Sequence, residues 1–286
     1  IYLSGDEKRV NGESVWWTTG DVVNGPFHTN GTLNIKGKPT FFDRVTYSNS
    51  INLYDNKSEP DCRKGPPEKV EELAFPDTNK QLKTQAEYNG YYFEGRTSIM
   101  LDGDSIKIRN KDNSTVQVIK DLKNGVIYVD GNTGDKKWDL STGNAFVSGK
   151  LNGRLTIAAS NDIYITGYDP TKLEWSEAKN NLTGGITYYD TTFDGQGNVV
   201  SNGDDMLGLV ANKYIFILHY GWFDKTSSYD ETNVALQNIN IHAALFALNK
   251  SYEFEKYDSG KFETITLVGS ICQNRRGGVG TFSGNT

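Results

Sequence analysis

The sequence predicts a mainly β protein, most simply a parallel β-solenoid with loop insertions, and three observations favour this class. The 286 residues include 30 Gly and 16 Tyr but only 2 Met, a composition typical of strands and turns rather than helices. Short runs of β-branched and aromatic residues recur, and each ends at Gly, Asn or Asp. Some neighbouring runs are about eight residues apart, a spacing natural for successive sides of a parallel coil.

The predicted strands follow one another along the chain with turn residues between them. The first cover 27–37 and 41–47, where Thr and Asn alternate with Leu and Ile before a second turn. The later runs share β-branched or aromatic content and cover 126–129, 145–147, 154–157, 162–165, 206–210, 213–217, 241–248 and 264–268.

The spacing of these runs favours the solenoid over other β architectures. Leu155 to Ile163 and Leu209 to Ile217 both step by about eight residues through a tight connection that contains Asn. Asn and Gly suit solenoid corners because they tolerate left-handed backbone angles and Asn side chains can stack. The corner candidates are Asn30-Gly31, Asn124-Gly125, Asn152-Gly153, Asn161 and Asn212. An antiparallel β-sandwich or barrel is the alternative, since Asn-Gly is also a strong hairpin signal.

Residues 1–286 are expected to form a single β-rich ectodomain with two interruptions. Residues 54–90 hold four Pro and include 68–73, which can form a short helix. Residues 169–204 are rich in Gly, Asn and Asp and are expected to form a loop insertion. No stretch approaches the ~20 apolar residues of a membrane span, and the chain opens at Ile1 without a start Met, so we expect a trimmed ectodomain.

Charge and cysteine content limit the classes of partner and site. The net charge is −6, which gives no overall attraction to nucleic acid or to anionic lipid. Cys62 and Cys272 lie outside any Cys-x-x-Cys or Cys/His cluster, so a structural zinc site has no support. A disulfide between them and two free thiols are the two alternatives.

Five segments resemble, in fixed order, a family of prepilin-associated bacterial surface proteins of unassigned function, similar to the solenoid-bearing minor pilins of competence and type IV pili. The segments are Gly25–Leu33, Gly153–Gly167, Leu207–Tyr214, Ala243–Leu248 and Gly269–Phe282. The resemblance implies a β-solenoid grafted on a pilin-like core, displayed at a pilus tip among other pilins. It also implies a hydrophobic N-terminal helix before Ile1 as the membrane anchor, although the chain shows no prepilin cleavage motif.

The motifs of known enzyme classes are absent or out of order in the sequence, so we expect a non-enzymatic protein. Parallel β-coils also host polysaccharide hydrolases and lyases, whose hydrolytic members need two suitably spaced carboxyl groups. Fragments of one such hydrolase pattern occur at 106–110, 132–135, 203–205 and 218–221, but with insertions and in the wrong order. The three His residues have structural interpretations: His28 at a turn, His219 among aromatics and His242 on a strand.

One loop of the sequence suits a hard cation such as Ca²⁺ as a cofactor. Asp130, Asn132 and Asp135 place side-chain oxygens in a Gly-containing loop, although the loop lacks the EF-hand pattern. A plain Asx-turn is the alternative interpretation. Asp194 to Asn198 is a weaker second candidate.

Adjacent aromatic residues carry the binding hypothesis. On a strand the two members of a pair point to opposite faces, so one can be buried while the other stacks on a sugar or a base. Basic residues near such a row would serve DNA capture, and Lys136-Lys137 and Arg275-Arg276 are the nearest clusters. The binding candidates are Trp16, Trp17, Tyr220, Trp222, Phe223, Arg275 and Arg276.

The sequence therefore predicts an extracellular, pilus-associated binding or assembly module on the bacterial surface. Adhesion to an extracellular glycan or protein is the favoured activity, and DNA capture for uptake is the alternative. A β-helix polysaccharide hydrolase or lyase is the enzymatic alternative.

Overall fold

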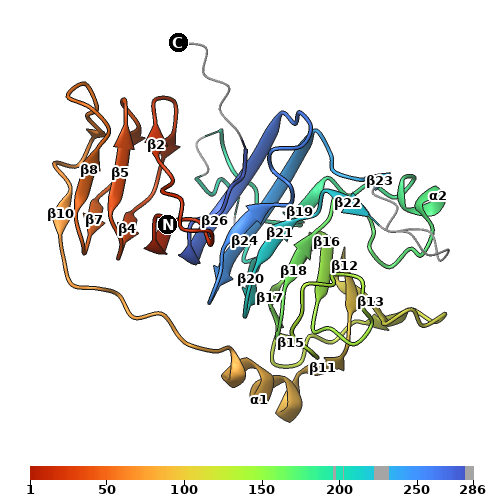
Figure 1. Ribbon diagram of the computed structural model, residues 1–286. Helices are drawn as coiled ribbons and strands as arrows, with labels where there is room; N and C mark the ends of the chain where they lie inside the picture. Colours follow the sequence, from red (N-terminus) through yellow and green to blue (C-terminus); the bar gives the residue numbers. More distant parts are fainter. Residues whose placement is uncertain (196–197, 202, 222–231, 281–286) are drawn as a thin grey trace.

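A computed structural model describes residues 1–195, 198–201, 203–221 and 232–280 of the chain. Within these residues the protein is mainly β, as predicted, and its largest sheet is built almost entirely from parallel pairs (Figure 1). The antiparallel alternative is therefore wrong for the main sheet. Antiparallel ladders occur between β12 (Thr97–Gly103), β13 (Ser105–Asn110) and β14 (Gln117–Ile119), and between β22 (Tyr220–Gly221) and β23 (Thr232–Asn233).

The strands form three rows that we call A, B and C, and the chain passes from A to B to C and back to A. Consecutive passes lie side by side in parallel register. In the first part of the chain Phe27 lies beside Val45 and Leu33 beside Ile51, a spacing of 18 residues in both cases.

Row A runs through the whole molecule. Each of its strands pairs in parallel with the next in the row. In spatial order they are β11 (Tyr91–Glu94), β15 (Val126–Asp130), β17 (Arg154–Ala159), β20 (Met206–Ala211), β24 (Asn238–Ala247), β26 (Thr264–Arg275), β1 (Tyr2–Asp6), β4 (Phe27–Thr29), β7 (Val45–Tyr47) and β10 (Glu68–Lys69).

Rows B and C have one stretch in each half of the molecule. In the half that contains α1, row B holds β12, β16 (Ala145–Leu151), β18 (Ile163–Ile165), β21 (Ile215–Ile217) and β25 (Tyr252–Phe254). Row C there holds the ends of β12 and β16, then β19 (Gly185–Tyr188) and the first parts of β24 and β26. In the other half row B holds β2 (Trp17–Thr18), β5 (Leu33–Lys36) and β8 (Ile51–Leu53), and row C holds β3 (Val22–Val23), β6 (Thr40–Phe41) and β9 (Asp61–Cys62).

The order of strands in space differs from the order along the chain. The chain starts in the middle of row A at β1, winds outward to β10, and returns along the outside through residues 70–79 to the opposite end (Figure 1). There α1 (Lys80–Asn89) packs against β11 and β15, and the chain then winds back until β26 pairs with β1. The row A sheet is thus continuous across β1 and β26, which lie near opposite ends of the sequence.

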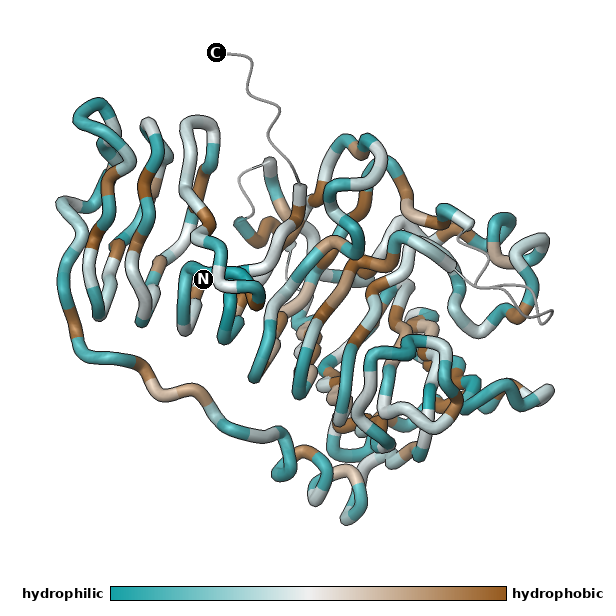
Figure 2. Tube along the Cα trace, viewed as in Figure 1, coloured by the Kyte–Doolittle hydropathy of each residue, from teal (hydrophilic) through white to brown (hydrophobic). Residues whose placement is uncertain are grey.

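Hydrophobic residues concentrate on the strands (Figure 2), and their inward-facing side chains form the core. Alternation along each strand places every second residue inside. Two of the predicted corner residues bond to an Asn of a neighbouring pass: the amide of Asn161 donates to Asn144 at 2.7 Å, and the amide of Asn249 donates to Asn212 at 3.3 Å.

Two predictions about the interruptions need correction. Residues 68–73 do not form a helix, because Glu68 and Lys69 continue row A beside Thr46 and Tyr47; the helix lies later, at α1. The 169–204 segment is not only a loop, since it contains α2 (Trp175–Ala178) and the row C strand β19.

Candidate binding groove

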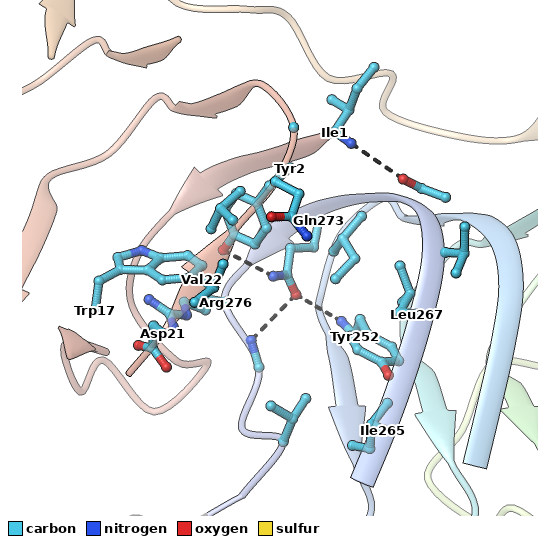
Figure 3. A pocket seen from close by; sticks show the side chains of 18 of the residues that line it. Ile1, Tyr2, Trp17, Asp21, Val22, Tyr252, Ile265, Leu267, Gln273 and Arg276 are labelled. Carbon is cyan, nitrogen blue, oxygen red and sulfur yellow. Dashed lines mark hydrogen bonds between the residues drawn. The ribbon is translucent and has the colours of Figure 1, made fainter. Parts of the chain in front are cut away.

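Row C is interrupted by a groove in the middle of the molecule. On one side lies the first part of β26, and on the other side lies β3 with the residues around it. Row A continues past this point through the β26–β1 pair. In row B, the amide of Phe254 on β25 donates to the carbonyl of Gly278, just after β26. The resulting cavity measures about 590 Å³ and is open to solvent. Figure 3 shows side chains that line it. This volume lies in the range of ligand sites.

The wall formed by β26 presents an unpaired strand edge. Residues 264–268 pair with β24 on one side, and no strand of the described residues pairs with the other side. Further along β26, the main-chain groups of Gly269 and Ile271 point toward β1. The carbonyl of Gly269 accepts from the Ile1 nitrogen at 3.3 Å, and the amide of Ile271 donates to the Ile1 carbonyl at 2.9 Å. Main-chain groups alternate in direction along a strand. The N–H and C=O groups of Ile265 and Leu267 therefore point into the groove.

The groove also interrupts a column of inward-facing apolar side chains in row C. Ile186, Ile241 and Leu267 are register neighbours on one side of it, and Val23 and Phe41 are neighbours on the other. Ile186, Ile241 and Phe41 are fully buried, whereas Leu267 and Val23, which flank the groove, are only half-buried. One apolar layer of the column is therefore missing at the groove.

Tyr252, which also lines the groove, has a buried hydroxyl without a partner in the described part of the chain. Its side chain is only 5% exposed, and its hydroxyl has no hydrogen-bond partner among the described residues. Figure 3 shows this ring beside Ile265 and Leu267. Burial raises the pKa of the hydroxyl, which therefore keeps its proton. An unpaired buried hydroxyl costs roughly 1–3 kcal/mol, and a bound acceptor would recover that cost.

Gln273 fixes the floor of the groove. Its side-chain carbonyl accepts from the amide of Tyr252 at 2.9 Å and from that of Gly277 at 3.4 Å, and its amide donates to the Tyr2 hydroxyl at 3.2 Å (Figure 3). These bonds join β25, β26 and β1 and hold the groove in one shape.

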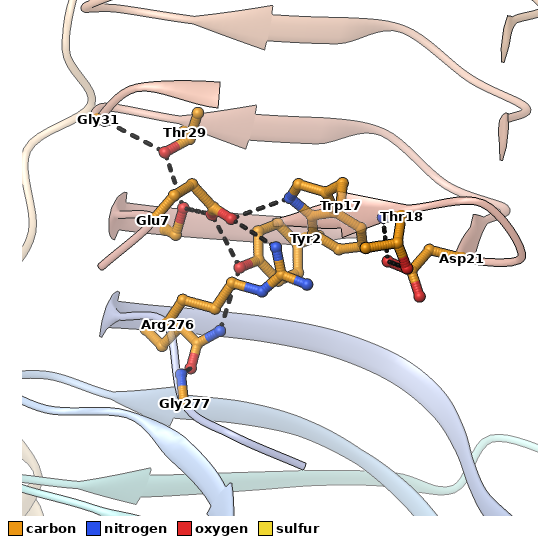
Figure 4. A network of polar contacts seen from close by, with 11 residues as sticks. Tyr2, Glu7, Trp17, Thr18, Asp21, Thr29, Gly31, Arg276 and Gly277 are labelled. Atoms are coloured by element: carbon orange, nitrogen blue, oxygen red, sulfur yellow. Dashed lines mark hydrogen bonds and ion pairs between the residues drawn. The ribbon is translucent and has the colours of Figure 1, made fainter. Parts of the chain in front are cut away.

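A buried polar network centred on Glu7 lies next to the groove (Figure 4). Glu7 is fully buried and accepts hydrogen bonds from Tyr2 and from the Trp17 indole at 2.9 Å each, and from Ser4. Arg276 completes the network with an ion pair to Glu7 at 2.9 Å and lies 3.7 Å over the Trp17 ring. The network joins the end of β26 to the start of the chain.

The Trp16-Trp17 pair splits between surface and core, as predicted for adjacent aromatics. Trp17 is the buried member; it packs with Tyr2, Phe27 and Phe41 and also lines the groove. Trp16 points outward and meets Tyr54 edge-on at 5.4 Å. Trp17 therefore serves packing rather than exposed stacking.

The second aromatic cluster is described only in part. Tyr220 stacks on His219 at 3.9 Å and bonds to Ser259, while Lys256 lies over its ring. Trp222 and Phe223 lie outside the described residues. Nothing in the described contacts joins Tyr220 to Trp16.

Three of the four basic candidates are engaged by carboxylates. Arg275 pairs with Asp6 at 2.8 Å, Arg276 pairs with the buried Glu7, and Lys137 pairs with Glu255. These ion pairs neutralise the side chains that DNA capture would require.

The three residues proposed for calcium have different partners. The Asp130 carboxylate accepts from Lys83 at 2.6 Å and from Tyr92 at 2.8 Å. The Asn132 amide donates to Ser141, and the exposed Asp135 lies 3.8 Å from Lys213. Across the described ranges no group of three or more His, Cys, Asp or Glu converges as a metal site would require. The weaker candidate at 194–198 includes residues outside the described part.

Of the two alternatives for Cys62 and Cys272, the structure has two free thiols. Cys272 lies on β26, while Cys62 lies on β9, in the pass that begins with β7. The row A order β26, β1, β4, β7 separates the two passes by roughly three strand spacings of about 4.8 Å, more than the ~7 Å that a disulfide spans between Cα atoms.

Trp17 and Arg276, which line the groove, were among the binding candidates, but the free strand edge, Tyr252 and Glu7 were missed in the sequence because each looks ordinary there. The Thr-Ile-Thr-Leu-Val run at 264–268 predicted the strand, but no sequence signal shows that a strand lacks a neighbour. Glu7 lies in a polar segment and gives no sign of its burial.

No family model matches the chain, and no curated protein or solved structure matches it either. In the described part of the chain, no helix is both long enough and apolar enough to span a bilayer.

Proposed function

We propose that the chain is a parallel β-solenoid that acts as a non-enzymatic binding or assembly module on the bacterial surface. The repeated A–B–C path and the 18-residue spacing support the solenoid. The sequence resemblance to solenoid-bearing minor pilins supports an extracellular, pilus-associated setting, in which other pilins are partners.

The groove between β26 and β3 is the binding site of this proposal. The observation that carries it is a solvent-open cavity lined by an unpaired strand edge, with the buried Tyr252 hydroxyl lacking a partner in its wall. Unsatisfied main-chain and side-chain groups at one place favour a ligand that supplies the missing hydrogen bonds.

Among the ligand classes, the groove favours a protein over a glycan or DNA. Its wall offers the main-chain groups of a strand edge and the unpaired hydroxyl of Tyr252. The aromatic side chains that line it, those of Tyr2, Trp17 and Tyr252, are buried rather than exposed for stacking. The neutralised Arg275 and Arg276 offer little to phosphates.

A blocked groove tests the site. Val22 lines the groove and is 56% exposed, so Val22→Trp fills the groove with little effect on the core. Val118→Trp is the matched control, because Val118 is 52% exposed on β14 and does not line the groove.

The purified chain and both variants are applied to arrays of extracellular proteins, glycans and DNA at low and physiological salt. We expect a salt-resistant protein ligand whose affinity falls at least tenfold in Val22→Trp and not in Val118→Trp. Equal binding by all three chains would place the site elsewhere, and binding that weakens steeply with salt would favour DNA.

A further inference from the structure

We infer that the ligand of this groove is an extended polypeptide segment of a partner protein, which adds a strand to row C between β26 and β3. The inference rests on the proposed function and names the partner class for the same site. Addition of a strand to a free sheet edge is a general mode of peptide recognition, in which main-chain hydrogen bonds give affinity and alternate side chains give specificity.

Main-chain geometry is the first argument. Ile265 and Leu267 offer two N–H donors and two C=O acceptors at strand spacing along the free edge, and only a polypeptide backbone matches that alternating row. Neighbouring strands lie about 4.8 Å apart, so one strand fills the position between β26 and the next strand of row C.

The direction of the bound segment follows from its neighbours. Row C pairs in parallel on both sides of the groove, at β24–β26 and at β3–β6. A segment that runs parallel to β26 also continues directly into the existing β26–β1 pairing at Gly269 and Ile271.

Side-chain requirements follow from burial. Ile265 and Leu267 point inward and Thr264 and Thr266 point outward. The segment therefore needs two apolar residues, two positions apart, that pack between Leu267 and Val23, with polar residues between them. Because these inward side chains are apolar, the Tyr252 hydroxyl donates to a main-chain carbonyl of the segment, which gives that hydroxyl its missing partner.

A defined peptide tests the inference on the intact chain. The probe is fluorescein-labelled Lys-Thr-Val-Thr-Val-Thr-Lys, capped at its C-terminus and titrated by fluorescence anisotropy. In a parallel pair, the residues that bond to Ile265 and Leu267 are those whose side chains face outward, here the Thr residues. N-methylation of the central Thr amide therefore removes a bond to β26, whereas N-methylation of a Val amide affects the opposite edge.

We expect saturable binding that falls at least tenfold when the central Thr is methylated and less when a Val is methylated. Val22→Trp lowers the affinity at least tenfold, and Tyr252→Phe lowers it roughly three- to tenfold, the effect of one hydrogen bond. Val118→Trp leaves it unchanged.

Contrary outcomes separate the inference from the proposed function. Absence of probe binding, or binding that is indifferent to N-methylation, overturns the strand inference. The proposed function still stands if the chain binds another ligand and Val22→Trp abolishes that binding. If the chain binds the probe only when it is shortened to end at Gly280, residues 281–286 are the occupant, and the inference of a partner protein is overturned.

Discussion

At the scale of single residues, Glu7 is the clearest case of a side chain whose environment sets its role. A fully buried carboxylate is costly unless it is paired and hydrogen-bonded, and Glu7 has Arg276, Tyr2, Trp17 and Ser4 as partners. Because these residues come from both ends of the chain, the network stabilises the contact between the two halves.

Glu7→Gln is expected to lower the free energy of unfolding by about 3–5 kcal/mol, because Arg276 keeps a buried charge without its counter-charge. Urea denaturation followed by fluorescence measures the change. Glu13→Gln is the control: its ion pair with Arg9 is largely exposed, so a change below about 1 kcal/mol is expected. A small effect of Glu7→Gln would show that the network does not join the halves.

The buried Asp162 leads to a prediction about how the free energy of unfolding depends on pH. The carboxyl group is only 4% exposed and accepts from the amide of Tyr214 at 3.0 Å. Burial is the main cause that raises its pKa from 3.8 to about 6. The folded state therefore holds this proton more tightly than the unfolded state, so its contribution to stability is present below about pH 4 and is lost as the pH rises through about 6.

Between pH 4 and pH 7 the natural chain is expected to lose up to about 3 kcal/mol more unfolding free energy than Asp162→Asn, from about 1.4 kcal/mol per pKa unit. Urea titrations at the two pH values give the difference. Asp204→Asn, at an exposed site whose charge does not act on Asp162, should follow the natural chain. If Asp162→Asn does so too, Asp162 is not the titrating group.

At the scale of elements, the segment 70–79 is a strap across the outside of row A. Asn30 holds it with two bonds to Leu73, one to the carbonyl at 2.8 Å and one from the amide at 2.9 Å. Further along, Phe75 meets Phe246, and the Asn79 amide donates to the Ala159 carbonyl at 2.8 Å. The strap thus contacts strands from both halves.

Asn30→Ala is expected to speed proteolytic cleavage within 70–79 roughly thirtyfold, because two hydrogen bonds of about 1 kcal/mol each no longer oppose local opening. Limited proteolysis with mass spectrometry measures the rate and the cleavage site. Asn49→Ala is the control, since Asn49 donates to Thr32 and not to the strap. Equal rates in the two variants would contradict this role for Asn30.

Local sequence signals predicted the elements that depend on local chemistry. The spacing from Leu155 to Ile163 indicated successive sides, and these residues do lie on adjacent strands β17 and β18 of rows A and B. The helix was misplaced because a Pro-led acidic run resembles a helix start, whereas row A pairing decides the conformation of Glu68. The groove could not be predicted, because it depends on Tyr2 lying beside Ile271.

At the scale of the whole molecule, the chain order is permuted relative to the spatial order of its strands. The two halves meet at β26 and β1, and both Ile1 and Val279 line the groove. A different starting point should therefore give the same packing.

A circular permutant tests this arrangement. It opens the chain between Glu71 and Glu72, both exposed in the strap, and joins Gly280 to Ile1 through a short Thr-, Ser- and Gly-containing link. We expect the same far-UV circular dichroism as the natural chain and a melting temperature at least as high, with at least tenfold weaker binding of the strand probe because the link crosses the groove. An unfolded permutant would contradict the continuity of the sheet across β26 and β1.

The central claim is that the edge of β26 at residues 264–268 accepts a strand. Amide hydrogen exchange of the intact chain, measured residue by residue with and without the Lys-Thr-Val-Thr-Val-Thr-Lys probe, tests it most directly. We expect that the amides of Ile265 and Leu267 exchange quickly in the free protein and become protected when the probe binds, while Thr266, already paired with β24, changes little. Protection that appears elsewhere, or amides of Ile265 and Leu267 that stay unprotected at saturating probe, would contradict it.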